Sequence, residues 1–341
     1  AVDAKSRGAE VLTRKRCTSL VRSGDHWDAV LEGPTGSETR SFKAVVNAAG
    51  AWVDDILGLD PGKKTETHLR LVKGSHIIVP RWHEGNHAYF FQNGDGRIMF
   101  AIPYERGEFT LIGTTDVPYE ANRDAVKITQ DEIEYLCDGA SEYYARAVTP
   151  SDVVATYSGV RPLYDDHAAN ASKVTRDYVL KLDDEAGAPI LSVFGGKITT
   201  YRELAEDALQ TLEDIFPSAG KEWTRDADLP GGDMPGADFD GFFIGLKRDY
   251  PNLDANLLER LARAYGTKVR QLLANADTDA GLGRMFGAGL TEAEARYLVE
   301  AEFARSADDI LWRRSKLGLH MSDAERGAFS DWMTDHIKTH A

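Results

Sequence analysis

The chain has 341 residues, of which 42% are hydrophobic, and a formal net charge of −15. A chain of this length forms one large core or, as we expect here, two or three packed units. The negative charge argues against a nucleic-acid partner, because the basic surface that neutralises phosphates is missing. No apolar run approaches the roughly 18 residues of a membrane-spanning helix, and no signal-peptide pattern opens the sequence, so we expect a cytoplasmic protein.

The two cysteines, Cys17 and Cys137, are far apart and outside any metal-ligand spacing, and the nine histidines are scattered. The sequence therefore predicts neither a disulfide framework nor a metal site. In an acidic protein, a site for an anion needs a local group of cations. We expect such a site where arginine or lysine lies next to glycine.

The first fifty residues read as short alternating strands with turns at residues 23–25 and 33–36. An apolar strand over residues 44–47 then ends in Ala-Ala-Gly, and "AWVDDILGL" follows with helical spacing. This is the first strand–glycine–helix junction of the chain.

Longer β-type runs begin near residue 69, in "LRLVKGSHIIVPR", "HAYFFQNGDGRIMFAIPYE" and "EFTLIGTTDVPYE". Turns at residues 93–96 and 106–108 predict hairpins, and hence an antiparallel sheet. A helix follows, with Thr129 as its predicted cap.

Three further β-type runs lead to the second junction, "LSVFGGKITTYRELAEDAL". Here we expect a helix that extends to about residue 216 and opens with a capping box between Thr200 and Glu203. A glycine- and proline-rich linker follows it, and from about residue 220 the apolar spacing predicts a separate helical domain.

At the second junction, Gly195 and Gly196 let a ligand approach the backbone closely, while the following helix start offers partial positive charge and free N–H groups. A delocalised anion fits there. The alternative is a plain strand-to-helix turn, which is common in α/β folds.

Arg161, in "SGVRPL", is followed by a proline that favours an extended backbone, and Gly159 keeps its approach open. Its guanidinium suits the recognition of an oxyanion. Arg176 has the same potential, with Asp177 as an ordinary ion-pair partner. For both arginines a simple surface position is the alternative.

His76 stands in the apolar run "KGSHIIVP" and is a candidate general base, because histidine titrates near neutral pH. A histidine satisfied within the core or at the surface is the commoner case. Thr114, Thr115 and Asp116 fit either a site or ordinary turn chemistry.

Together, "VVNAAGAWVDDI", "RLVKGSHIIVPR", "SGVRPLYDD", "SVFGGKITTYRE" and "ARSADDILWRRSKLGLH" closely resemble the bacterial flavin-dependent glycerol-3-phosphate dehydrogenases, over essentially the whole chain. The Phe-Gly-Gly-Lys-x-Thr-Thr-Tyr-Arg run is the most specific of these elements. The resemblance implies FAD as cofactor and oxidation of glycerol 3-phosphate to dihydroxyacetone phosphate, with electrons passed to a quinone or another acceptor. It also implies a peripheral contact with the inner face of the cell membrane; a homodimer is left open.

The implied fold class is α/β plus α+β: the remainder of an FAD-binding domain of glutathione-reductase or amino-acid-oxidase type, an antiparallel substrate domain and an all-helical C-terminal domain. The expected boundaries are residues 1–58 and 151–216 for the FAD domain, 59–150 for the substrate-covering sheet and 217–341 for the helices. No Gly-x-Gly-x-x-Gly loop follows a strand. We therefore expect an N-terminally truncated chain that holds FAD weakly and is inactive alone.

The resemblance assigns roles to the residues singled out above. Arg161 and Arg176 are implied to bind the substrate phosphate, and Lys197 to lie by the flavin and the substrate oxygens. His76 is the candidate base for the C2 hydroxyl, with Lys197 as its rival. The cofactor-lining residues are Ala48, Gly50, Trp52, Gly195, Gly196, Lys197, Ile198, Thr199 and Thr200.

Two other readings of the sequence compete with this one. Flavin amine or amino-acid oxidases also use a Gly-x-Arg-Pro arginine, there for a carboxylate; the additional cations Lys197 and Arg176 and the helical C-terminal domain favour a phosphate. A non-catalytic module that docks to a partner or membrane through "LWRRSKLGLH" is the second alternative.

Overall fold

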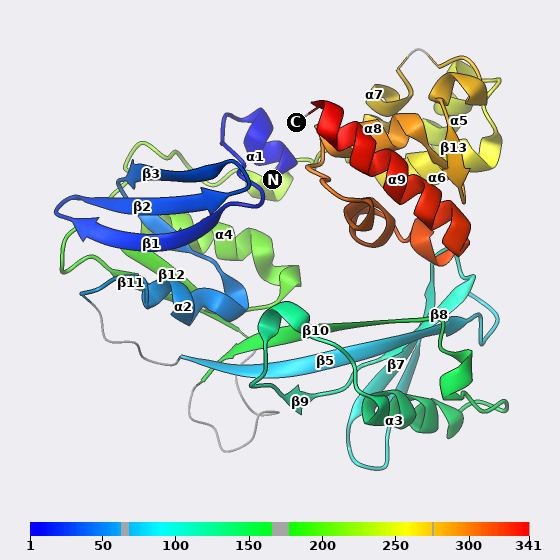
Figure 1. Ribbon diagram of the computed structural model, residues 1–341, viewed down its shortest axis with the longest axis horizontal. Helices are drawn as coiled ribbons and strands as arrows, with labels where there is room; N and C mark the ends of the chain where they lie inside the picture. The colour runs from blue at the N-terminus through cyan, green and yellow to red at the C-terminus, as the bar shows by residue number, and fades with distance from the viewer. Residues whose placement is uncertain (63–67, 166–176, 275, 341) are drawn as a thin grey trace. The chain divides into compact units, whose positions relative to one another are not determined.

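The computed structural model describes residues 1–62, 68–165, 177–274 and 276–340, with only the backbone for 337–340. The chain divides into two compact units, one of residues 14–225 and one that joins residues 1–13 to residues 226–341 (Figure 1). Residues 1–13 thus group with the helical part of the chain. The boundaries expected from the sequence instead place them in the FAD domain, together with the strands that follow. Within that unit, the ammonium of Lys5 lies 5.1 Å from the ring centroid of Phe303.

The unit of residues 14–225 begins with an antiparallel meander in the order β1–β2–β3. Its strands are β1 (Arg16–Ser23), β2 (His26–Gly33) and β3 (Gly36–Phe42). The meander buries Leu20, Trp27 and Ala29 against Ile190 of a second sheet and against Ala188, which precedes that strand. The turns fall where the sequence predicts them.

That second sheet has the order β11–β12–β4, with strands β11 (Tyr178–Asp183), β12 (Ile190–Gly195) and β4 (Val45–Asn47). β12 pairs with β11 antiparallel and with β4 parallel. Each parallel strand runs through a glycine turn into a helix: β4 into α2 (Val53–Leu57) and β12 into α4 (Tyr201–Thr211). Because the two strands run in the same direction, both glycine turns lie at the same edge of the sheet.

The larger antiparallel sheet has the order β10–β5–β8–β7–β6, and β9 also pairs with β5. Its strands are β5 (Leu69–Pro80), β6 (Tyr89–Gln92), β7 (Ile98–Tyr104), β8 (Phe109–Gly113), β9 (Val117–Pro118) and β10 (Ala155–Tyr164). The predicted hairpins at residues 93–96 and 106–108 connect β6 to β7 and β7 to β8.

Helix α3 (Gln130–Ser141) covers one face of this sheet. Alternate strand residues, among them Ile77, Met99 and Ile112, are fully buried with Leu136 of the helix. Thr129 caps α3 as predicted and forms a capping box with Glu132. The opposite face of the sheet carries His76 and Arg161.

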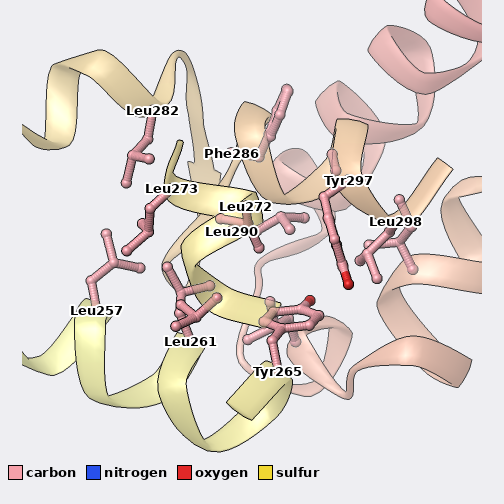
Figure 2. Close-up of a cluster of buried hydrophobic side chains, with 14 of the residues drawn as sticks. Leu257, Leu261, Tyr265, Leu272, Leu273, Leu282, Phe286, Leu290, Tyr297 and Leu298 are labelled. Atoms are coloured by element: carbon pink, nitrogen blue, oxygen red, sulfur yellow. The ribbon is translucent and has the colours of Figure 1, made fainter. Parts of the chain in front are cut away.

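The helical unit contains α1 (Val2–Ser6), α5 (Phe239–Asp249), α6 (Ala255–Tyr265), α7 (Val269–Leu273), α8 (Glu292–Glu300) and α9 (Asp323–His340). A short ribbon of β13 (Met285–Gly287) and β14 (Leu290–Thr291) also belongs to it, so this part of the chain is not purely helical. Figure 2 shows its apolar core, where Leu261 and Tyr265 of α6 pack with Tyr297 and Leu298 of α8. In the described part of the chain, no helix has the length and apolar character needed to cross a membrane.

Candidate functional site

The strand pair β5–β10 places the candidate base and the candidate anion-binding arginine on one face. The register pairs Tyr157 with His76, Gly159 with Gly74, and Arg161 with Val72. Because side chains alternate along a strand, these residues share one side of the sheet. The His76 ring stacks on Tyr157, with ring centroids 4.6 Å apart and planes at 10°.

Two glycines, Gly74 and Gly159, lie near the histidine and the arginine on this face. The Arg161 guanidinium lies over Gly74, where an added Cβ would come within 2.7 Å of Cζ. At Gly159 an added Cβ would have no atom within 4 Å, so the space beside it is open. This open space agrees with the expectation that Gly159 leaves the approach to Arg161 open.

The Thr-Thr-Asp segment that follows β8 holds the Arg161 guanidinium. Nη2 donates to Thr114 Oγ1 at 3.0 Å, and Nη1 donates to the Thr115 carbonyl at 3.4 Å and to Asp116 Oδ1 at 2.5 Å. Among the described residues Nε has no hydrogen-bond acceptor. The Nε–H and the second N–H of Nη2 can therefore still donate to an oxyanion.

The surroundings of His76 keep its imidazole neutral. Burial, and then the positive charge of Arg161, lower the pKa of His76 to about 4. Its ring lies against Gly113, where an added Cβ would come within 2.7 Å of Cγ. Nδ1 is buried with no hydrogen-bond partner in the described part of the chain. His76 is therefore neutral near pH 7 and has one ring nitrogen that can accept a hydrogen bond from a hydroxyl.

The second glycine junction adjoins the strand that carries Arg161. Gly195 and Gly196 have φ of +70° and +91°, which favour glycine. A Cβ at Gly195 would come within 3.7 Å of the Pro162 carbonyl and 3.5 Å of the Tyr164 nitrogen. The structure therefore brings this junction together with the end of β10.

Of the residues after Gly196, Ile198 leaves 89% of its surface exposed, and Lys197 is also exposed. No hydrogen bond or ion pair of the Lys197 side chain occurs within the described residues. The predicted capping box at Thr200 is wrong: its hydroxyl donates to the Lys197 carbonyl at 3.0 Å, and Glu203 pairs with Arg202 at 2.9 Å. Helix α4 also ends at Thr211, earlier than expected.

The first junction contributes a second glycine turn at the same sheet edge. Gly50 has φ of +57°, and an added Cβ there would have no atom within 4 Å. Arg123 donates to the Ala51 carbonyl and to Asp55, and it lies over the Trp52 ring at 5.7 Å. These contacts fix the turn that contains the predicted lining residues. Arg176 lies outside the described residues.

Sequence reasoning missed Tyr157 and Glu132. The alternation in "ATYSGVRPLY" puts Tyr157, Gly159 and Arg161 on one face of a strand, which was a usable signal for the first. The capping-box spacing from Thr129 identifies Glu132 as a helix residue, but its contacts across the sheet have no local signal.

Comparison with known proteins gives this site its context. Residues 1–202 match the family model described as FAD dependent oxidoreductase, and residues 223–334 match the C-terminal domain of alpha-glycerophosphate oxidase. The chain is 46% identical, over 97% of its length, to D-erythritol 1-phosphate dehydrogenase of Brucella abortus strain 2308. It is 44% identical, again over 97% of its length, to aerobic glycerol-3-phosphate dehydrogenase of Escherichia coli strain K12.

Among solved structures, glycerol-3-phosphate dehydrogenase from Bacillus halodurans complexed with FAD matches 99% of this chain and 67% of that one, with a TM-score of 0.84 and 27% identity. The fold and its glycine junctions thus define a flavoprotein oxidoreductase. The chain belongs to the FAD-dependent oxidoreductase family, with a C-terminal domain of the alpha-glycerophosphate oxidase type. The predicted fold class is confirmed, and FAD is the cofactor of this family. The chain spans 66% of the length of each of the two curated relatives named above.

The described residues fit a flavin at the edge formed by the two junctions. The open space at Gly50 and the exposed apolar side chain of Ile198 suit a planar ring. The helical turn from Ile198 and helix α4 begin at this edge without a capping side chain. A helix start of this kind offers backbone N–H groups and partial positive charge to electron-rich ring atoms.

Proposed function

We propose that this chain contributes the substrate site for FAD-dependent oxidation of sn-glycerol 3-phosphate to dihydroxyacetone phosphate. The observation that supports this proposal most directly is that the Nε donor of Arg161, which has no acceptor among the described residues, lies on the same sheet face as the neutral imidazole of His76. A phosphate monoester accepts parallel hydrogen bonds from a guanidinium edge. Arg176 and Lys197 are proposed to contribute further positive charge.

In this proposal, His76 accepts the proton of the C2 hydroxyl. Stacking on Tyr157 and contact with Gly113 fix the ring plane, and the open space at Gly159 leaves room for the carbon chain. The acceptor for the hydride from C2 would be supplied by FAD when it is bound. Ala48, Gly50, Trp52 and residues 195–200 are proposed to line it, as part of an FAD domain of residues 1–58 and 151–216.

A second candidate substrate is D-erythritol 1-phosphate, because a relative with 46% identity is named as its dehydrogenase. Both substrates carry a phosphate monoester and a secondary alcohol, which are the groups addressed by Arg161 and His76. The longer polyol needs more room beside Gly159. We also propose a quinone acceptor, with contact at a membrane surface.

The test follows the flavin spectrum of the protein under anaerobic conditions, with FAD supplied and excess removed. Bleaching of a retained flavin band by glycerol 3-phosphate or D-erythritol 1-phosphate would support the proposal and would overturn the expectation that this chain is inactive alone. Bleaching by sarcosine, glycine or D-amino acids instead would favour an amine or amino-acid oxidase. Arg161→Gln should raise the KM for the phosphate substrate, and Arg97→Gln, an exposed arginine paired with Asp95, is the control.

A further inference from the structure

A buried polar cluster lies on the sheet face opposite the site. Glu132 of α3, only 7% exposed, accepts from Ser75 Oγ at 3.0 Å and pairs with Lys73 Nζ at 2.8 Å. A carboxylate in the interior costs stability unless charged and polar groups compensate it. These donors provide that compensation.

Thr115 links this cluster to the other side of the sheet. Its hydroxyl donates to Glu132 Oε1 at 2.8 Å and accepts from the Ser75 backbone N–H at 3.0 Å. Its own N–H donates to the Ser75 carbonyl at 3.3 Å. Thr115 is 1% exposed and has its position fixed by these three bonds.

The residues on either side of Thr115 face the site. Thr114 Oγ1 and Asp116 Oδ1 accept from Arg161, as does the Thr115 carbonyl itself. The acceptors that orient the guanidinium therefore come from a short segment whose central residue is anchored by Glu132. Rotation of this segment would move these acceptors and so shift the Arg161 guanidinium from its place over Gly74.

We propose that Glu132, acting through Thr115, is a positioning residue for Arg161 and so sets the affinity of the site for its anionic substrate. The inference rests on the proposed function of Arg161 in binding phosphate. It adds a role for a carboxylate that lies on the opposite side of the sheet from the substrate.

The chain offers a matched pair of variants for the test. Thr115→Val and Thr129→Val each remove a hydroxyl that donates to Glu132. The Thr115 hydroxyl also accepts from the Ser75 backbone N–H, and the Thr129 hydroxyl accepts from the Glu132 backbone N–H. Only the first hydroxyl belongs to the segment that holds Arg161; the second caps α3. If the cluster has a purely structural role, the two variants should have similar effects on KM.

The measurement is steady-state kinetics of the flavin-loaded protein with glycerol 3-phosphate. Thr115→Val should raise KM about tenfold with kcat little changed, since the segment that orients Arg161 would lose its anchor to Glu132. Thr129→Val should lower thermal stability and leave KM near the wild-type value. In an Arg161→Lys background, Thr115→Val should raise KM no further.

Equal KM values for the two variants, or additive effects of Thr115→Val and Arg161→Lys, would overturn the inference. Failure of the proposed function gives a different result. In that case the wild-type protein would not oxidise glycerol 3-phosphate, or Arg161→Lys alone would leave KM unchanged.

Discussion

The guanidinium of Arg161 lies directly over Gly74, a residue of the neighbouring strand, so that an added Cβ would come within 2.7 Å of Cζ and of Nη1. Backbone on one side and the Thr114–Asp116 segment on the other confine the planar group. The orientation of Arg161 thus depends on the absence of a side chain at residue 74.

Gly74→Ala should therefore displace Arg161 and raise the KM for the phosphate substrate about tenfold, with a smaller effect on kcat, as expected when a binding group loses its position. Gly94→Ala is the control, because an added Cβ there has no atom within 4 Å. Unchanged KM in Gly74→Ala would show that the guanidinium tolerates the shift.

The titration of His76 is a second expectation. Burial, and then the charge of Arg161, hold its pKa at about 4, whereas a hydrogen bond with Asp25 raises the pKa of His26. A single NMR titration of the histidine side chains should report both pKa values, with the pKa of His76 below that of His26. Arg161→Gln should raise the His76 value by removing the cation. A His76 pKa near 6.5 would contradict this account.

The sign for stability follows from the same pKa. A histidine whose folded-state pKa lies below its unfolded value is preferred neutral in the fold, so its contribution is present above about pH 6.5 and is lost as the pH falls toward 4. His76→Gln should weaken the pH dependence of the free energy of unfolding between these limits. Denaturant titrations at pH 7 and pH 4.5 measure the difference.

Glu132 should affect acid stability in a lower pH range. Burial raises its pKa, but hydrogen bonds from Lys73, Thr129, Thr115 and Ser75 outweigh burial and lower the pKa to about 2. A carboxyl with a depressed folded-state pKa stabilises the fold above about pH 4.5, and that contribution disappears as the pH falls toward 2.

Glu132→Gln should accordingly destabilise the unit of residues 14–225 at pH 7, on the order of 3 kcal/mol, and should flatten its loss of stability below pH 4.5. Glu134→Gln, on the same helix, is the control, since Glu134 pairs only with Gln130 among the described residues. An acid unfolding profile identical to wild type would exclude this role of Glu132.

The helical unit contains its own buried ion pair. Arg260 donates to both oxygens of Glu294, which is fully buried and also accepts from Tyr265. Arg260→Met should leave this carboxylate uncompensated and destabilise the unit by about 3–5 kcal/mol. Hydrogen exchange of the α6 amides reports this unit separately from the rest of the chain. Arg263→Met, which breaks an exposed pair with Glu259, should cost less than about 1 kcal/mol.

Local patterns predicted much of what the structure contains. The hairpin turns, the Thr129 cap and the two strand–glycine–helix junctions depend on residues close in sequence, and all were identified. The capping box at Thr200 is not formed, because Glu203 pairs with Arg202 and the Thr200 hydroxyl donates to the Lys197 carbonyl. Local spacing permits a cap but does not decide between competing partners.

The arrangement of the site depends on pairing between distant strands, which no local pattern contains. Arg161 and His76 were both candidates, yet their common face follows from the β5–β10 register. The Glu132–Thr115 bond joins a helix to a loop across a sheet. Physical reasoning from sequence found the chemical groups, whereas their distances required the tertiary structure.

The parallel pairing of β12 with β4 has a consequence for folding kinetics. Within the described residues, the pairs Ile190–Val45, Leu191–Val46 and Ser192–Asn47 form the ladder between these strands, although a long stretch of chain that includes the larger sheet lies between them. Closing so long a loop costs entropy before the contacts repay it. We expect this ladder to form late, so that flavin fluorescence quenching during refolding would report the final step, when the two glycine turns meet.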